Sequence, residues 1–261
     1  MENFRLYGEK PIKFVLVHGG PGAPGGMAPV ARVVSEKVGV LEPFQTKKTI
    51  AGQIEELREQ IENYAEKPVT ILGWSWGAWL VVFLASKYPE LVEKLILVSS
   101  GPFEAEYAKR IMERRYRNLS KDECEEAKII LDKLYSGEEL EDKDEVLSRF
   151  GYLMTKADFY DELPHENEVV EVNGELHQKI WDEAAKMRES GELLEDVLNV
   201  KCPLTIIQGK EDSHPYEGLS EPLEKNGKKF KMILIERCGH YPWYEKYGRE
   251  EFFRILGSEL D

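Results

Sequence analysis

Three residues that are far apart in the chain could together perform nucleophilic catalysis: Ser75, Asp212 and His240. Ser75 is the centre of residues 73–77, a G-x-S-x-G pentapeptide between the apolar run 68–72 and a stretch with helical periodicity. A serine on such a strand-to-helix turn has its Oγ lifted clear of the sheet. Its hydroxyl is a good nucleophile only beside a histidine base, which a carboxylate usually orients. The pentapeptide therefore predicts a nucleophilic Ser75.

The base and the acid follow from two later segments. His240 comes just after the apolar run 230–235, and Asp212 just after the apolar run 203–207. Two parallel strands would bring both side chains to the edge of the sheet that carries the serine. The chain order serine, acid, histidine is that of enzymes with a strand-turn-helix nucleophile. Glu211 is chemically adequate as the acid, but an offset of one residue points its side chain elsewhere, so Asp212 is preferred.

A glycine-rich loop near the amino terminus could complete the site. The predicted strand Ile12–Val17 ends in the sequence His-Gly-Gly-Pro-Gly. Acyl transfer builds negative charge on the former carbonyl oxygen, which two backbone N–H groups can stabilise. We expect these donors to be the N–H groups of Gly20 and Trp76, because Pro21 has no N–H to offer.

The two glycine-rich motifs resemble those of a known family. The His-Gly-Gly-Pro-Gly loop at 18–22 and the Gly-Trp-Ser-Trp-Gly turn at 73–77 are similar to motifs of the proline iminopeptidase branch of the α/β-hydrolase superfamily. Trp74 stands where those peptidases usually have glycine. The resemblance implies an α/β-hydrolase fold and a helical cap over the active site. It also implies a serine hydrolase, and aminopeptidase and carboxylesterase are the two candidate activities.

The hydrophobic pattern independently predicts an α/β protein. Strand-like and helix-like segments alternate, which is typical of a mostly parallel sheet with helices on both faces. At most one short edge strand fits before residue 11. The predicted helices in the alternating part are 27–37, 50–64 with Thr49 as its N-cap, 78–88, 215–225 and 243–256. We expect a core made of residues 1–101 and 199–261.

Residues 102–198 interrupt the alternation and are predicted to form the helical cap. Their predicted helices are 105–119, 121–134, 144–154 and 176–194. Residues 104–196 carry 27 acidic and 14 basic side chains, so most of the chain's net charge of −14 lies there. Such helices usually just present solvated faces with i,i+4 ion pairs. The alternative is that their carboxylates bind a cationic group, such as the free amino terminus of a peptide.

Composition excludes several other classes of function. The negative charge argues against nucleic acid and anionic membranes as partners. The first residues are polar, and no apolar run is long enough to span a bilayer, so we expect a cytoplasmic protein. The three cysteines have no metal-ligand spacing, and the proposed chemistry needs no metal or organic cofactor. The expected partner is a small-molecule or short-peptide substrate, and the oligomeric state stays open.

Several residues near the predicted site have more than one interpretation. His18 is predicted to bond backbone rather than act as a base. His214 and Trp74 are candidates for the substrate pocket; the alternative for His214 is simple exposure, and the alternative for Trp74 is packing in the core. Cys238 is not expected to be a nucleophile, because Ser75 already supplies one. A ligand-binding or signalling protein on the same fold remains the alternative to an enzyme.

Overall fold

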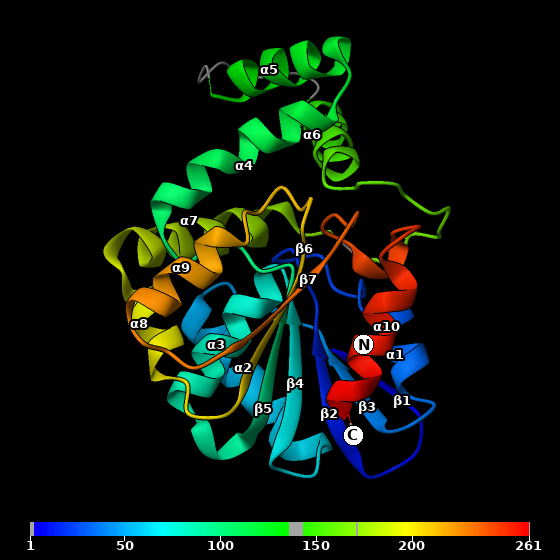
Figure 1. The fold of residues 1–261 in the computed structure, drawn as a ribbon, viewed down its shortest axis with the longest axis vertical. Helices are drawn as coiled ribbons and strands as arrows, with labels where there is room; N and C mark the ends of the chain where they lie inside the picture. The colour runs from blue at the N-terminus through cyan, green and yellow to red at the C-terminus, as the bar shows by residue number, and fades with distance from the viewer. Residues whose placement is uncertain (1–2, 136–142, 171, 261) are drawn as a thin grey trace.

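The computed structural model describes residues 3–135, 143–170 and 172–260. Its centre is a sheet with the strand order β1-β3-β2-β4-β5-β6-β7 (Figure 1). β1 pairs with β3 in the antiparallel sense, and the other neighbours are parallel. The strands are β1 (Phe4–Tyr7), β2 (Ile12–Val17), β3 (Gly39–Pro43), β4 (Val69–Trp74), β5 (Val92–Val98), β6 (Leu204–Gly209) and β7 (Lys231–Ile235). This arrangement confirms the mostly parallel sheet and the single short opening strand.

The two faces of the sheet bury alternate residues of each strand. In β2, Val15 and Val17 join one apolar cluster with helices α2 and α3, while Phe14 and Leu16 join another with α1 and α10. This follows from the two-residue period of a strand, whose successive side chains point to opposite faces. Figure 1 shows helices on both sides of the sheet. The helices of this part are α1 (Ala28–Val34), α2 (Ile50–Tyr64), α3 (Trp76–Lys87), α9 (Glu217–Lys225) and α10 (Arg249–Leu260), with short 3₁₀ turns at Pro89–Leu91 and Pro242–Tyr244.

Residues 102–198, called the insertion below, lie between β5 and β6. Their helices are α4 (Ala105–Asn118), α5 (Lys121–Tyr135), α6 (Lys143–Ala157), α7 (Gly174–Ser190) and α8 (Glu192–Asn199). α4, α5 and α6 share a small apolar cluster at the end of the molecule beyond the sheet (Figure 1). α7 and α8 instead pack into the main core beside α3. The division into core and cap stays a prediction.

Two of the predicted helices differ from the structure. The segment 176–194 is not one helix, because Gly191 takes the left-handed conformation, with φ of 90°, and ends α7 before α8 begins. The segment 243–256 begins in the 3₁₀ turn Pro242–Tyr244, and α10 begins only at Arg249. Between them, the buried Glu245 carboxylate accepts hydrogen bonds from the backbone N–H groups of Tyr160, Asp161 and Gly239. These bonds join this segment to the loop that follows α6 and to the loop that carries His240.

The prediction for α2 is confirmed in detail. The helix runs over residues 50–64, and the Thr49 hydroxyl caps it by accepting from the N–H of Gly52 at 3.0 Å.

Among the described residues, no helix is long and apolar enough to cross a membrane.

Candidate active site

The turn between β4 and α3 holds Ser75 in a backbone conformation that is unusual for serine. Its φ is 53° and its ψ is −116°. The flanking glycines are required by contact: a Cβ on Gly73 would lie 2.3 Å from the carbonyl oxygen of Gly77, and one on Gly77 would lie 2.4 Å from that of Val17. Both distances are far below a van der Waals contact. The G-x-S-x-G pattern is thus the set of residues that lets this turn close against β2.

The first glycine-rich loop lies directly against this turn. A Cβ on Gly19 would stand 2.7 Å from the Trp74 ring and 3.0 Å from the Cβ of Ser75. The next residue, Gly20, has a φ of 58°. Trp76 is the first residue of α3, so the helix itself provides no acceptor for its N–H. The two expected oxyanion donors therefore belong to the glycine-rich loop that contacts the serine turn and to the helix that follows the serine.

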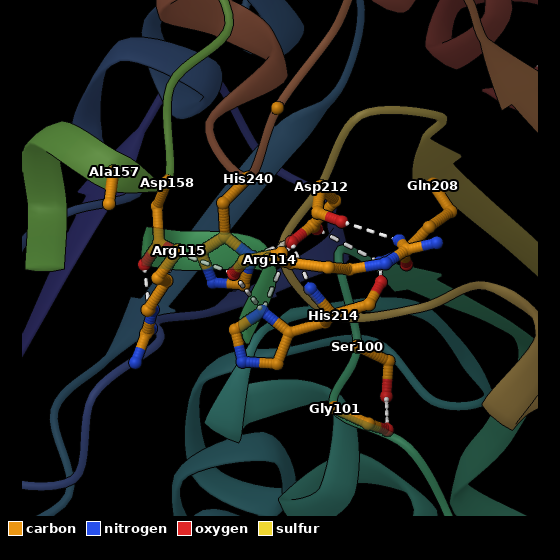
Figure 2. A network of polar contacts seen from close by, with 12 residues as sticks. Ser100, Gly101, Arg114, Arg115, Ala157, Asp158, Gln208, Asp212, His214 and His240 are labelled. Atoms are coloured by element: carbon orange, nitrogen blue, oxygen red, sulfur yellow. Dashed lines mark hydrogen bonds and ion pairs between the residues drawn. The ribbon is translucent and has the colours of Figure 1, made fainter. Parts of the chain in front are cut away.

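The acid and the base expected from the sequence are in direct contact (Figure 2). Asp212 is fully buried, and His240 Nδ1 lies 2.9 Å from its Oδ2 and 3.1 Å from its Oδ1. Gln208 Nε2 also donates to Oδ2, at 2.9 Å. The neighbouring Glu211 is occupied elsewhere, because its carboxylate accepts from the backbone N–H of Cys238 at 2.9 Å.

The histidine loop is joined to the serine turn and to the acid loop. Trp74 Nε1 donates to the carbonyl oxygen of His240 at 3.0 Å, and its ring packs 5.0 Å from that of Trp243. A Cβ on Gly209 would lie 2.3 Å from the carbonyl oxygens of both Cys238 and Gly239. These contacts hold the ends of β4, β6 and β7 together. Trp74, a candidate for the pocket, directly precedes the serine and thus connects the serine turn to the histidine loop.

The ionisation of the pair suits a histidine base. Burial alone would raise the pKa of Asp212, but the two neighbouring imidazoles outweigh it and hold that pKa below its ordinary value. Burial alone would lower the pKa of His240, yet the Asp212 carboxylate outweighs it and raises that pKa. Asp212 is therefore a carboxylate at neutral pH, and it favours the protonated form of His240.

Two other groups near the site are held in unreactive forms. Burial lowers the pKa of His18 to about 4, and its Nδ1 lies 2.7 Å from the Gly19 carbonyl oxygen. That contact agrees with its expected bond to backbone. Burial raises the pKa of the Cys238 thiol, which thus stays protonated at neutral pH.

The insertion contributes an ion pair between a partly buried arginine and a buried aspartate, which the sequence did not indicate. Arg115 of α4 donates from Nε and Nη2 to the two carboxylate oxygens of Asp158, at 2.8 and 2.7 Å (Figure 2). The Asp158 carbonyl oxygen accepts from the N–H of His240 at 2.8 Å. Ser213, in the acid loop, donates its hydroxyl to the same carboxylate. No local pattern marks this pair, because its members are 43 positions apart in a strongly charged segment.

His214 is the second imidazole in contact with Asp212. Its Nδ1 lies 3.0 Å from Asp212 Oδ1, and its ring stacks on that of His240 with 4.4 Å between centroids. Asp212, His214 and His240 are the group of described residues whose ligand atoms lie close enough, within 4.8 Å, to hold a metal ion. Both carboxylate oxygens already accept hydrogen bonds from N–H donors, from Gln208 at Oδ2 and from the His214 backbone at Oδ1. That donor set is typical of an oriented carboxylate.

Comparison with known proteins places this geometry in a family. A model described as the alpha/beta hydrolase family matches residues 14–254. The chain belongs to this family. It is accordingly a hydrolase, and both the predicted fold and the predicted family are confirmed.

Individual relatives of this alpha/beta hydrolase are distant. The proline iminopeptidase of Saccharolobus solfataricus is 22% identical, over 99% of this chain and 88% of that protein. Among solved structures, VinJ is similar with a TM-score of 0.69 at 16% identity, covering 98% of this chain and 93% of that one. A structure reported with carboxylesterases of Nitrososphaera gargenis has a TM-score of 0.63 at 17% identity, covering 98% and 93%. At these identities the structural similarity shows the fold alone.

Proposed function

We propose that the protein is a serine hydrolase that cleaves a small ester or amide through an acyl-enzyme on Ser75. The observation that carries this proposal is the buried Asp212–His240 pair, whose loop is hydrogen-bonded to the turn bearing Ser75. The turn exposes the serine hydroxyl, and an adjacent imidazole oriented by a carboxylate is what activates such a hydroxyl.

The proposed reaction has two halves, formation of the acyl-enzyme and its hydrolysis, and the same groups act in both. His240 Nε2 takes the proton of the Ser75 hydroxyl while Oγ bonds to the substrate carbonyl carbon. The N–H groups of Gly20 and Trp76 stabilise the oxyanion until the bond to the leaving group breaks. His240 gives its proton to the departing alcohol or amine. It then takes a proton from a water molecule that attacks the acyl carbon, and it returns that proton to Ser75 Oγ as the acyl–Oγ bond breaks and the acid is released. Asp212 stabilises the imidazolium in both halves.

Carboxylesterase and aminopeptidase activities both fit this mechanism. The proline iminopeptidase relatives and the two shared motifs favour an aminopeptidase. Charge pairing favours the esterase, because carboxylates that already have a cationic partner do not need a substrate ammonium. Asp158, the insertion carboxylate beside the His240 loop, is paired with Arg115. Glu123 and Glu126 on α5 are paired with cations of α6. We propose that the insertion covers the site as a cap.

Active-site labelling tests the proposal. A fluorophosphonate should label the wild-type protein once, and Ser75→Ala should abolish labelling and lower activity by about 10³-fold or more. Ser100→Ala is the matched control, because Ser100 is another buried serine at the end of a neighbouring strand, and its hydroxyl only bonds the Gly101 carbonyl. Labelling that survives in Ser75→Ala, or an active protein that takes no label, would reject Ser75 as the nucleophile.

Matched substrates separate the two candidate activities. An aminopeptidase must bind the substrate ammonium, so an aminoacyl anilide should be cleaved about 10²-fold faster, as kcat/KM, than its N-acetylated form. An esterase should cleave p-nitrophenyl esters better and should tolerate acetylation. Equal kcat/KM for the free and acetylated anilides would exclude recognition of the amino terminus. No turnover of either class by labelled protein would exclude both candidate activities.

A further inference from the structure

His214 has more contacts with the acid than a pocket-lining residue would need. Its backbone N–H donates to Asp212 Oδ1 at 2.8 Å, and its Nδ1 lies 3.0 Å from the same oxygen. His240 uses mainly the other oxygen, at 2.9 Å. Figure 2 shows the two imidazoles on the same side of the carboxylate, and their rings are stacked with an interplanar angle of 27°.

The neighbouring groups determine which nitrogen of His214 carries the proton. Ser213 donates its hydroxyl hydrogen to the Asp158 carboxylate, so towards the His214 Nδ1, 3.3 Å away, its Oγ can only accept. Asp212 Oδ1 is also an acceptor. Two acceptors facing Nδ1 require a proton there, and a neutral His214 therefore donates Nδ1–H. Asp158 is itself held by Arg115, so this chain of contacts starts in the insertion.

The local charges allow only one imidazolium in this cluster. Four titratable or charged groups face the His214 ring: Asp212 in its own loop, His240 in the loop after β7, Asp158 after α6, and Arg115 on α4. A fifth, Arg114, donates a hydrogen bond to the Asp212 carbonyl oxygen. Asp158 is neutralised by Arg115, which leaves Asp212 to balance a single positive charge. Burial, and then the charge of His240, lower the pKa of His214, while the pKa of His240 is raised.

We propose that His214 is a positioning residue for the catalytic base: as a neutral donor it holds Asp212 Oδ1, so that Oδ2 stays directed at His240 Nδ1, and its ring supports that of His240. This inference rests on the proposed serine hydrolase function. When His240 takes the serine proton, the imidazolium forms beside the Asp212 carboxylate while His214 stays neutral. His214 thus orients the Asp212–His240 pair and exchanges no proton with the substrate.

Two substitutions separate the hydrogen bond from the ring contact. His214→Phe keeps a stacked ring but removes the donor, and His214→Asn keeps an amide donor near the position of Nδ1 but removes the ring. Loss of one hydrogen bond to a charged group should lower kcat of the Phe variant by about 10-fold, with KM unchanged. Its acid limb in kcat/KM should move to higher pH, because a carboxylate with one donor fewer stabilises protonated His240 more strongly. The Asn variant should restore the wild-type limb.

The control substitution is His165→Phe, at a histidine whose ring stacks on Tyr244 away from Asp212. It should leave kcat, KM and the acid limb unchanged. In the wild-type protein, ¹⁵N NMR of the imidazoles should show His214 protonated at Nδ1 alone throughout the pH range in which His240 titrates. This measurement needs no variant and so does not depend on how the variants fold.

Three outcomes would overturn the inference. The first is a Phe variant with the kcat and acid limb of the wild type. The second is a change in KM alone, which would make His214 a substrate contact. The third is an NMR titration in which His214 takes a proton before His240. In each case fluorophosphonate labelling at Ser75 separates the failures: labelled, active protein means that only the role of His214 is wrong, and protein that turns over substrate without taking the label means that the proposed function is wrong.

Discussion

At the scale of single residues, the site depends on which of two adjacent carboxylates reaches the histidine. Asp212 contacts His240, while the Glu211 carboxylate accepts from the backbone N–H of Cys238, two positions before His240. A shift of one position in the chain thus separates a group that acts on the imidazole from one that holds its loop.

Paired amide substitutions test this division. Asp212→Asn keeps the shape but removes the charge that stabilises the imidazolium, so kcat should fall by about 10²-fold to 10⁴-fold. Glu211→Gln retains an acceptor for the N–H of Cys238, and kcat should stay within several-fold of wild type. Steady-state kinetics on one ester would check both, and a larger loss in the Gln variant would transfer the role to Glu211.

The raised pKa of His240 predicts the pH dependence. The base must be neutral to accept the serine proton, so kcat/KM should fall as the pH drops through the pKa of His240. Because Asp212 raises that pKa, the acid limb should lie above the ordinary histidine value of 6.5. A kcat/KM profile measured from weakly acidic to alkaline pH checks this, and a limb below 6.5 would contradict it.

At the scale of elements, the carboxyl ends of β2 and β4 meet so closely that only glycine fits between them. The β2–β4 register brings Val17 opposite Gly73, which puts the His-Gly-Gly loop beside the serine turn. The turn is thus as much a consequence of strand packing as of its own sequence.

Two glycine substitutions in helices should have opposite effects on stability. Gly77→Ala puts a Cβ 2.4 Å from the Val17 carbonyl oxygen and should lower the free energy of unfolding by about 2 kcal/mol or more. Gly151→Ala, inside α6 with no atom within 4 Å of the added Cβ, should raise it by about 1 kcal/mol. Urea denaturation measures both, and equal effects would mean that the contact at Gly77 relaxes without cost.

At the scale of the whole molecule, the Arg115–Asp158 pair joins the insertion to the loops that carry Asp212 and His240. Asp158 ends the α6 segment and bonds Ser213 through its carboxylate and His240 through its backbone. Residues of three separate chain segments therefore determine the surroundings of one imidazole.

Removing one partner of this pair should destabilise the fold. Asp158→Asn leaves Arg115 without its counter-charge and should cost about 3 kcal/mol at neutral pH, whereas the double variant with Arg115→Met should recover part of that loss. The pKa of Asp158 is lowered in the folded state, so its contribution is complete above its ordinary pKa and is lost as the pH falls through the folded value. The difference between wild type and Asp158→Asn should therefore shrink only under strongly acidic conditions. A cost below about 0.5 kcal/mol would show that the pair does not stabilise the fold.

Local patterns, namely glycine-rich turns and apolar strands, were enough to predict the family, the sheet and the serine, acid and histidine candidates. They misplaced the start of the last helix, where the Glu245 carboxylate bonds the backbone N–H groups of residues 84 and 85 positions away. The folded structure was needed to show that Glu211 accepts from a backbone N–H, that His214 shares the carboxylate of Asp212, and that Arg115 and Asp158 meet. No local sequence pattern predicts those contacts, because each of them depends on how separate loops and helices pack. The charged side chains come within reach of their partners only after the chain has folded.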